Sequence, residues 1–222
     1  KETPPPRRNK KIPDPTSENP RALRDEHNRV RYITVGFRVS AEQNEKIREL
    51  YGEKQGRWIG VAPFSIARGK TLPFRKMKNI IAHFDKQPNT KIFLFGAGEM
   101  ENELLSDWQS LYENVYAVHT NLKLDDELAL MNNLDVMLCM DSANMHIASM
   151  MGTRTLSIWG ATHPKAGFKG WKQGDDSVVD VPLPCRPCSI YGNKPCKLGN
   201  LRCMNDIDTE RIVGKVLELL SV

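Results

Sequence analysis

The stretch from Asp135 to Gly160 constrains the fold of this chain more than any other part of the sequence. It begins with an apolar run, Val136–Met140, which breaks at the polar pair Asp141-Ser142. An apolar-rich segment of helical length follows, then a glycine, then a second β-rich run over Thr155–Trp159. This order predicts a strand, a turn, a helix and another strand, which is the repeating unit of a parallel sheet.

The same alternation of strand and helix patterns recurs along the chain. Further strands are expected at Tyr32–Val39, Arg57–Pro63, Lys91–Phe95, Val115–His119 and Val178–Val181. Further helices are expected at Ala41–Tyr51, Pro73–Phe84, Met100–Tyr112, Asp125–Met131 and Asp206–Leu220. Alternation of this kind predicts an α/β fold, a Rossmann-like parallel sheet with helices on both faces.

Three polar segments fall at the carboxyl ends of the expected strands, where such sheets bind their ligands. They are the Ser65–Lys70 loop, the Gly96–Glu99 turn and the pair Asp141-Ser142. The first amides of the helix after Ser142 lack partners within the helix, so the turn suits an anion. Asp and Ser are also common helix caps that bind nothing. The convergence of three segments, rather than the cap alone, therefore predicts a ligand site.

The positive charge of the chain is concentrated at its start. The net charge is +5, and residues 1–31 hold nine Lys or Arg and five Asp or Glu, so four of the five charges lie there. A nucleic-acid-binding domain would carry its basic residues on the folded part, so no nucleic acid is expected as a partner. Residues 1–31 are also rich in proline, which predicts a largely disordered basic linker or tail before a folded domain over 32–222.

Composition also limits the location. The sequence has no run of eighteen apolar residues, and its opening lacks the apolar core of a secretion signal. We expect a cytoplasmic protein. Its basic tail is expected to be a solvated linker, and the alternative is a basic strip that contacts acidic lipid headgroups at the inner membrane or a phosphate-bearing substrate. The first residue is not Met, which fits a fragment or a processed chain.

Five cysteines raise the question of a metal site. Cys139 lies in an expected strand, as an inert core residue. The other four begin with a C-x-x-C pair and are Cys185, Cys188, Cys196 and Cys203. Structural zinc, disulfides and free thiols are all compatible with this pattern. The irregular spacing and the lack of a secretion signal favour free thiols, and we expect no metal.

Two motifs, one of them long, resemble those of glycosyltransferase family nine, the ADP-heptose:lipopolysaccharide heptosyltransferases. The stretch DSANMHIASMMGTRTLSIWGATHP is similar to the family's D-[ST]-[GA]-x-x-H-x-A-x-x-x-G-x-P-x-x-x-x-[FY]-G-x-T-x-P. Ala143, Arg154 and Trp159 replace the usual Gly, Pro and Phe or Tyr. Lys70 with Leu72-Pro73 resembles the family's K-x-W-P, and the cysteine tail is similar to that of many members.

The resemblance covers about residues 57–220 and implies the C-terminal, donor-binding half of a GT-B glycosyltransferase. It implies transfer of heptose or a related sugar, with inversion and without a metal, from a nucleoside diphosphate sugar such as ADP-heptose to a lipopolysaccharide core. Family members take their catalytic carboxylate base from the N-terminal half, and residues 1–31 are too few to form that half. No catalytic residue is therefore expected here, and this chain alone is expected to be inactive.

The resemblance also implies roles for individual residues in donor binding. Lys70 would hold the diphosphate with Ser65, and the amides of Ser142 and Ala143 would cradle a phosphate. The remaining residues would contact the sugar (Asp141, His146), the ribose (Glu99, Glu101) and the base (Leu122). Two alternatives remain at this point: a sugar-nucleotide epimerase of the same fold, and a non-catalytic nucleotide-binding module that recruits a partner.

Overall fold

The computed structural model describes residues 22–24, 30–33, 38–118 and 122–221, which form parts of two compact units, Lys1–Phe37 and Arg38–Val222. In the first unit, β1 (Ala22–Arg24) pairs with β2 (Val30–Ile33) in an antiparallel ladder. Strand β1 lies in the segment for which the sequence predicts no regular structure, and the pairing with β2 accounts for it. The predicted strand Tyr32–Val39 overlaps β2 in part, and residues 34–37 lie outside the described residues.

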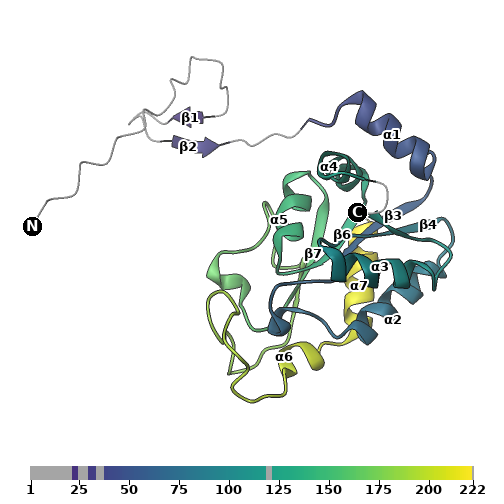
Figure 1. The fold of residues 1–222 in the computed structure, drawn as a ribbon. Helices are drawn as coiled ribbons and strands as arrows, with labels where there is room; N and C mark the ends of the chain where they lie inside the picture. Colours follow the sequence, from purple (N-terminus) through teal and green to yellow (C-terminus); the bar gives the residue numbers. More distant parts are fainter. Residues whose placement is uncertain (1–21, 25–29, 34–37, 119–121, 222) are drawn as a thin grey trace, which may run out of the picture. The chain divides into compact units, whose positions relative to one another are not determined.

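The second unit is built on a six-stranded sheet in the order β5-β4-β3-β6-β7-β8 (Figure 1). Every neighbouring pair in this sheet is parallel, as the alternating sequence pattern predicts. The strands are β3 (Arg57–Ala62), β4 (Thr90–Leu94), β5 (Val115–Ala117), β6 (Val136–Met140), β7 (Arg154–Trp159) and β8 (Val178–Asp180).

The helices lie within a few residues of their predicted positions. They are α1 (Ala41–Tyr51), α2 (Phe74–Asp85), α3 (Glu99–Gln109), α4 (Leu124–Asn133), α5 (Ala143–Met150), α6 (Arg202–Asn205) and α7 (Thr209–Leu220). A local signal explains the start of α1, where Ser40 and Gln43 form a capping box. No helix in the described ranges is long and apolar enough to cross a bilayer.

The helix predicted over Asp206–Leu220 begins later than expected. Asp208 caps α7 by accepting a hydrogen bond from the Glu210 amide, so the helix starts at Thr209. The separate short helix α6 precedes it, and Ile207 between them is buried in the core. The cap at Asp208 therefore sets the start of α7, and α6 lies before the predicted segment.

Both faces of the sheet are buried against helices, which gives the unit two apolar layers. Helices α2, α3 and α7 cover one face, and α1, α4 and α5 cover the other. Residues of strand β6 alternate between the two layers. Val136, Leu138 and Met140 pack in the layer of α2, α3 and α7, whereas Met137 and Cys139 pack in the layer of α1, α4 and α5. This two-residue period in an all-apolar strand is typical of a central parallel strand.

The strand order determines where a ligand can bind. From β3 the chain adds β4 and β5 on one side, and then returns to place β6, β7 and β8 on the other. The loops after β3 and β6 therefore diverge from each other at the carboxyl edge. Such a reversal leaves a crevice between the two loops, which is where open α/β sheets bind their ligands.

Candidate functional site

A cavity of about 620 Å³ opens at the reversal between β3 and β6. Its walls come from segments that follow β3, β4, β6 and β7, and from the long loop before α6. The lining residues are Phe64, Ser65, Ile66, Lys70, Ala97, Glu101, Asp141, Ser142, Ala143, Asn144, His146, Phe168, Ile190 and Tyr191.

The carboxylate of Asp141 is the central polar group of this cavity. Its Oδ2 accepts a hydrogen bond from Thr162 Oγ1 at 2.7 Å and lies 3.1 Å from Lys70 Nζ. The two side chains of the ion pair are only 8% (Asp141) and 12% (Lys70) exposed. Ser65 Oγ donates to the backbone carbonyl of Asp141 at 3.2 Å. The pair thus joins the segments after β3, β6 and β7 at one point.

The N-terminus of α5 faces the same cavity without a side-chain cap. Ser142 occupies the cap position, yet its side chain accepts no hydrogen bond from the first turn. Its hydroxyl oxygen is buried and has no hydrogen-bond partner among the described residues. A buried hydroxyl without a partner costs free energy unless a ligand supplies one. The helix dipole and the unbonded first amides make an anion the ligand that this end of α5 favours.

Seven of the residues expected from the sequence line this one cavity. They are Ser65, Lys70, Glu101, Asp141, Ser142, Ala143 and His146. Glu101 also closes the turn after β4, because its Oε2 accepts a hydrogen bond from the Ala97 amide at 2.9 Å. The structure therefore brings together the residues that the sequence motifs placed at three separate strand ends.

Two expected residues lie elsewhere. Glu99 borders a shallow depression beside α3, together with Asn102 and Asp107. Leu122 is 8% exposed and belongs to the apolar layer beneath α4. It follows β5 at the edge of the sheet, two strands from the reversal, and its apolar side chain packs inward.

Arg186 had no predicted role, yet it holds the edge of the site together. Its guanidinium is 2% exposed and donates to the carbonyl oxygens of Trp159, Gly160, Thr162 and Val181. It also pairs with Asp180 Oδ2 at 2.8 Å. A planar group with five donors can satisfy a converging set of carbonyls in this way. No periodicity or spacing in the sequence could have shown this convergence.

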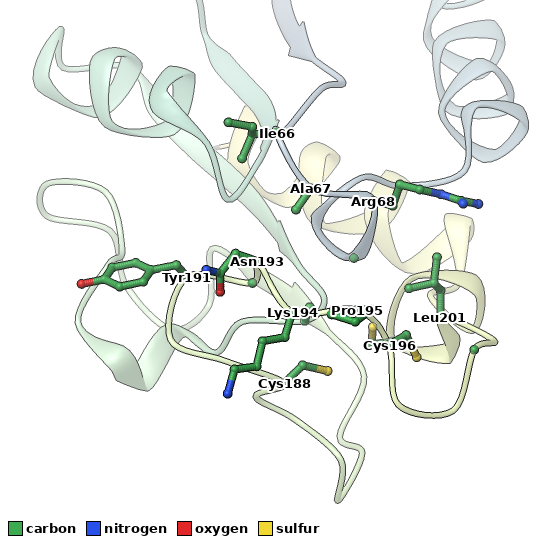
Figure 2. Close-up of a pocket in the computed structure, with 15 residues that line it drawn as sticks. Ile66, Ala67, Arg68, Cys188, Tyr191, Asn193, Lys194, Pro195, Cys196 and Leu201 are labelled. Carbon is green, nitrogen blue, oxygen red and sulfur yellow. The ribbon is translucent and has the colours of Figure 1, made fainter.

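A second cavity of about 630 Å³ lies beside the first and shares Ile66 and Tyr191 with it. Cys188, Cys196 and Cys203 line it. Figure 2 shows Cys188 and Cys196 on the side near Leu201, with Tyr191 projecting away from them. All five cysteines are free thiols in the structure, and Cys185 is exposed outside this cavity.

The thiols around this cavity differ in their acidity. Backbone amides of the turn after Cys196, that of Leu201 foremost, donate to its sulfur and lower its pKa. Burial and the neighbouring thiols raise the pKa of both Cys188 and Cys203. Among the described residues, no three His, Cys, Asp or Glu side chains converge closely enough to hold one metal ion.

Comparisons with known proteins agree on one family. The model of glycosyltransferase family 9 (heptosyltransferase) matches residues 29–198. Lipooligosaccharide heptosyltransferase 2 of Campylobacter jejuni serotype O:6 is 29% identical over 133 residues, which are 58% of this chain and 41% of that protein. The chain thus spans less than half the length of this curated relative.

Solved structures share the fold of the second unit. The E. coli ADP-heptose lipopolysaccharide heptosyltransferase II aligns with a TM-score of 0.66 at 15% identity, covering 87% of this chain and 55% of that one. The iron-containing dodecameric glycosyltransferase TibC from enterotoxigenic E. coli aligns with a TM-score of 0.52 at 14% identity, covering 86% and 48%. These likenesses confirm the predicted α/β fold.

The shifted pKa values predict an order of thiol reactivity. Because the thiolate is the reactive species, alkylation of Cys196 should begin at lower pH than that of Cys188 or Cys203. Brief iodoacetamide treatment between about pH 6 and 9, with reductant removed and chelator present, followed by peptide mass spectrometry, measures this order. Equal midpoints, or a later midpoint for Cys196, would show that the amides do not stabilise its thiolate.

Proposed function

This chain belongs to glycosyltransferase family 9, the heptosyltransferases, and from this premise we propose that residues 38–222 form the donor-binding half of such an enzyme. The donor is a nucleoside diphosphate sugar. ADP-heptose is named as the donor of the E. coli structural neighbour, and it is the donor that we assign to this chain. The transfer inverts the anomeric carbon, as the family resemblance implies.

The observation that carries this proposal is the arrangement of positive charge around Asp141. Lys70 and the first residues of α5 line one cavity, and the Ser142 hydroxyl at the start of α5 has no hydrogen-bond partner among the described residues. A diphosphate bound there gains charge-assisted hydrogen bonds from the ammonium and neutral ones from the amides. The Lys70 ammonium has three donors and uses one on Asp141, so the others are available to phosphate oxygens.

The same groups explain how the site promotes transfer. When the sugar–phosphate bond breaks, negative charge grows on the departing diphosphate. Lys70 and the α5 amides are already in position to stabilise that charge, so little reorganisation is needed as the bond breaks. The low exposure of Lys70 strengthens its interaction with phosphate, because water screens it less.

Further contacts distinguish the two ends of the donor. Thr162 and Lys70 both contact Oδ2 of the Asp141 carboxylate. Its other oxygen, Oδ1, accepts no hydrogen bond from a described residue, and we assign it to a sugar hydroxyl. His146 lies one turn into α5 on the same side. Glu101, on the β4 side, is assigned to the ribose hydroxyls. Glu99 and Leu122 lie outside the cavity, so these contacts do not rely on them.

Donor binding in this proposal uses no metal ion. The positive charge that a divalent cation often supplies to a diphosphate comes here from Lys70 and the helix N-terminus. The iron named for the structural neighbour TibC is a property of that protein. Cys188, Cys196 and Cys203, which line the second cavity, are proposed to act there as thiols.

The acceptor and the place of action extend the proposal to the whole enzyme. The acceptor is the lipopolysaccharide core, and the reaction takes place in the cytoplasm, with peripheral contact at the inner membrane through the basic residues 1–31. No feature of the site favours the epimerase or the non-catalytic module over the transferase.

Replacing Lys70 tests the diphosphate site. Lys70→Ala should weaken ADP binding by about 1–3 kcal/mol, the range for a hydrogen bond to a charged group, and leave adenosine binding nearly unchanged. Lys70→Met keeps the alkyl chain and should behave alike. Calorimetry in buffer with EDTA measures both ligands and also tests the metal-free premise.

Arg68→Ala is the matched control, because Arg68 lies on the same loop but borders the second cavity. It should leave the affinity for ADP unchanged. Equal losses of affinity for ADP and adenosine in the Lys70 variants would show that Lys70 does not contact the phosphates. Binding of ADP that disappears in EDTA and returns with added metal would overturn the metal-free proposal.

A second prediction concerns transfer. The 222-residue chain alone should bind ADP-heptose yet transfer no sugar, because acceptor positioning and the general base belong to the other half of the enzyme. Positioning of the acceptor lowers the activation barrier by up to roughly 7–11 kcal/mol. The general base contributes roughly 10²–10⁴-fold in rate. Radiolabelled transfer to a lipopolysaccharide core, with a two-domain family member as positive control, is the measurement. Robust transfer by the chain alone would place the base within it, with Asp141 as the first residue to replace.

A further inference from the structure

An exposed apolar wall borders the donor cavity on its β7 side. Phe168, Ile190 and Tyr191 form it, and they are 36%, 59% and 68% exposed. The two aromatic rings lie 5.9 Å apart between centroids, tilted by 42°. A cluster of exposed apolar side chains indicates a binding surface, whereas single exposed apolar residues are common and indicate nothing.

The loop that carries Ile190 and Tyr191 is held in place by contacts with Lys70 and with the end of β7. Gly192, next to Tyr191, has φ +70°, and a Cβ on it would lie 2.7 Å from Lys70 Cδ and 3.0 Å from the Thr162 methyl carbon. The backbone of this loop therefore lies directly against the side chain of Lys70. The Cys188 amide also donates to Ala161 at 2.7 Å, which fixes the loop to the end of β7. Tyr191, the residue before Gly192, lines the same cavity as Lys70.

The strand order gives the cavity two distinct ends. Lys70 and the start of α5 occupy its middle, after β3 and β6. Ala97 and Glu101 line the β4 side, whereas the aromatic wall lies on the β7 side. A nucleoside diphosphate sugar is a linear molecule whose diphosphate separates the nucleoside from the sugar. With the diphosphate in the middle and the ribose at Glu101, the sugar must extend toward β7.

We propose that Phe168 and Tyr191 form the wall on which the sugar ring of the donor packs, so that they contribute to recognition of the sugar rather than of the nucleotide. This inference rests on the proposed function. A pyranose ring presents an apolar face of C–H groups, and an aromatic ring can cover that face. Tyr191 also carries a hydroxyl that can contact both water and the sugar's own hydroxyls.

Binding of two ligands to two variants tests this directly. In Phe168→Ala and Tyr191→Ala, the Kd for ADP should stay within about twofold of the wild type. The Kd for ADP-heptose should rise on the order of tenfold, since about 1.4 kcal/mol of lost contact corresponds to that factor. Tyr191→Phe should restore most of the affinity for ADP-heptose. Calorimetry gives all values, and unchanged thermal midpoints show that the variants fold.

Trp171→Ala is the matched control, because Trp171 is 58% exposed on the same unit but does not line the donor cavity. It should change neither affinity. An unchanged affinity of the Phe168 and Tyr191 variants for ADP-heptose would overturn the inference. So would an equal loss for ADP and ADP-heptose, which would place the nucleotide against the wall. Failure of the wild-type protein to bind ADP would instead overturn the proposed function, and this inference with it.

Discussion

The buried pair of Asp141 and Lys70 is the interaction on which the site depends. It joins the loops after β3 and β6, and Thr162 adds the segment after β7 to the same carboxylate oxygen. Two charges removed from water are stable only when paired and hydrogen-bonded, and losing one partner leaves the other uncompensated. The three segments that form the cavity therefore keep their positions together. In the account proposed here, the ammonium held by Asp141 is also the group that receives the diphosphate.

A second set of contacts fixes these loops from behind. The Ala161 amide donates to Gly69 at 2.7 Å, and a Cβ at Gly160 would lie 2.2 Å from the Gly69 carbonyl oxygen. Only glycine permits this approach of two backbones. Arg186 then saturates the carbonyls at the end of β7 with its guanidinium. The loop between β8 and α6, which carries Arg186, thus contacts the end of β7 and the side chain of Lys70, and the same loop carries Tyr191 to the donor cavity.

Much of this arrangement was predictable from sequence, because local patterns encode it. The apolar run Val136–Met140 appears as β6, and the helix expected over Ala41–Tyr51 appears as α1. The family motifs singled out Lys70 and Asp141, which the structure pairs in one cavity, and their roles in donor binding stay a prediction. The family assignment itself is confirmed by the match over residues 29–198.

Tertiary contacts account for what the sequence could not show. Phe168 and Tyr191 lie in loops without any period, and hydrogen bonds from Arg186 and Cys188 position the loop of Tyr191. The resemblance implies that Leu122 lines the base of the nucleotide, and its side chain lies in the apolar layer beneath α4, a tertiary contact that the motif does not encode. The last helix likewise starts at Thr209 rather than Asp206, because Asp208 caps it.

A diphosphate is proposed to bind between Lys70 and the start of α5. A crystal structure of the 222-residue chain with ADP is the most direct test of this site. The account predicts phosphate oxygens at about 2.7–3.2 Å from Lys70 Nζ and from the Ala143 amide, with the adenosine extending toward Glu101. A diphosphate seated instead in the neighbouring cavity lined by Cys188 and Cys196, away from Lys70 and α5, would contradict it.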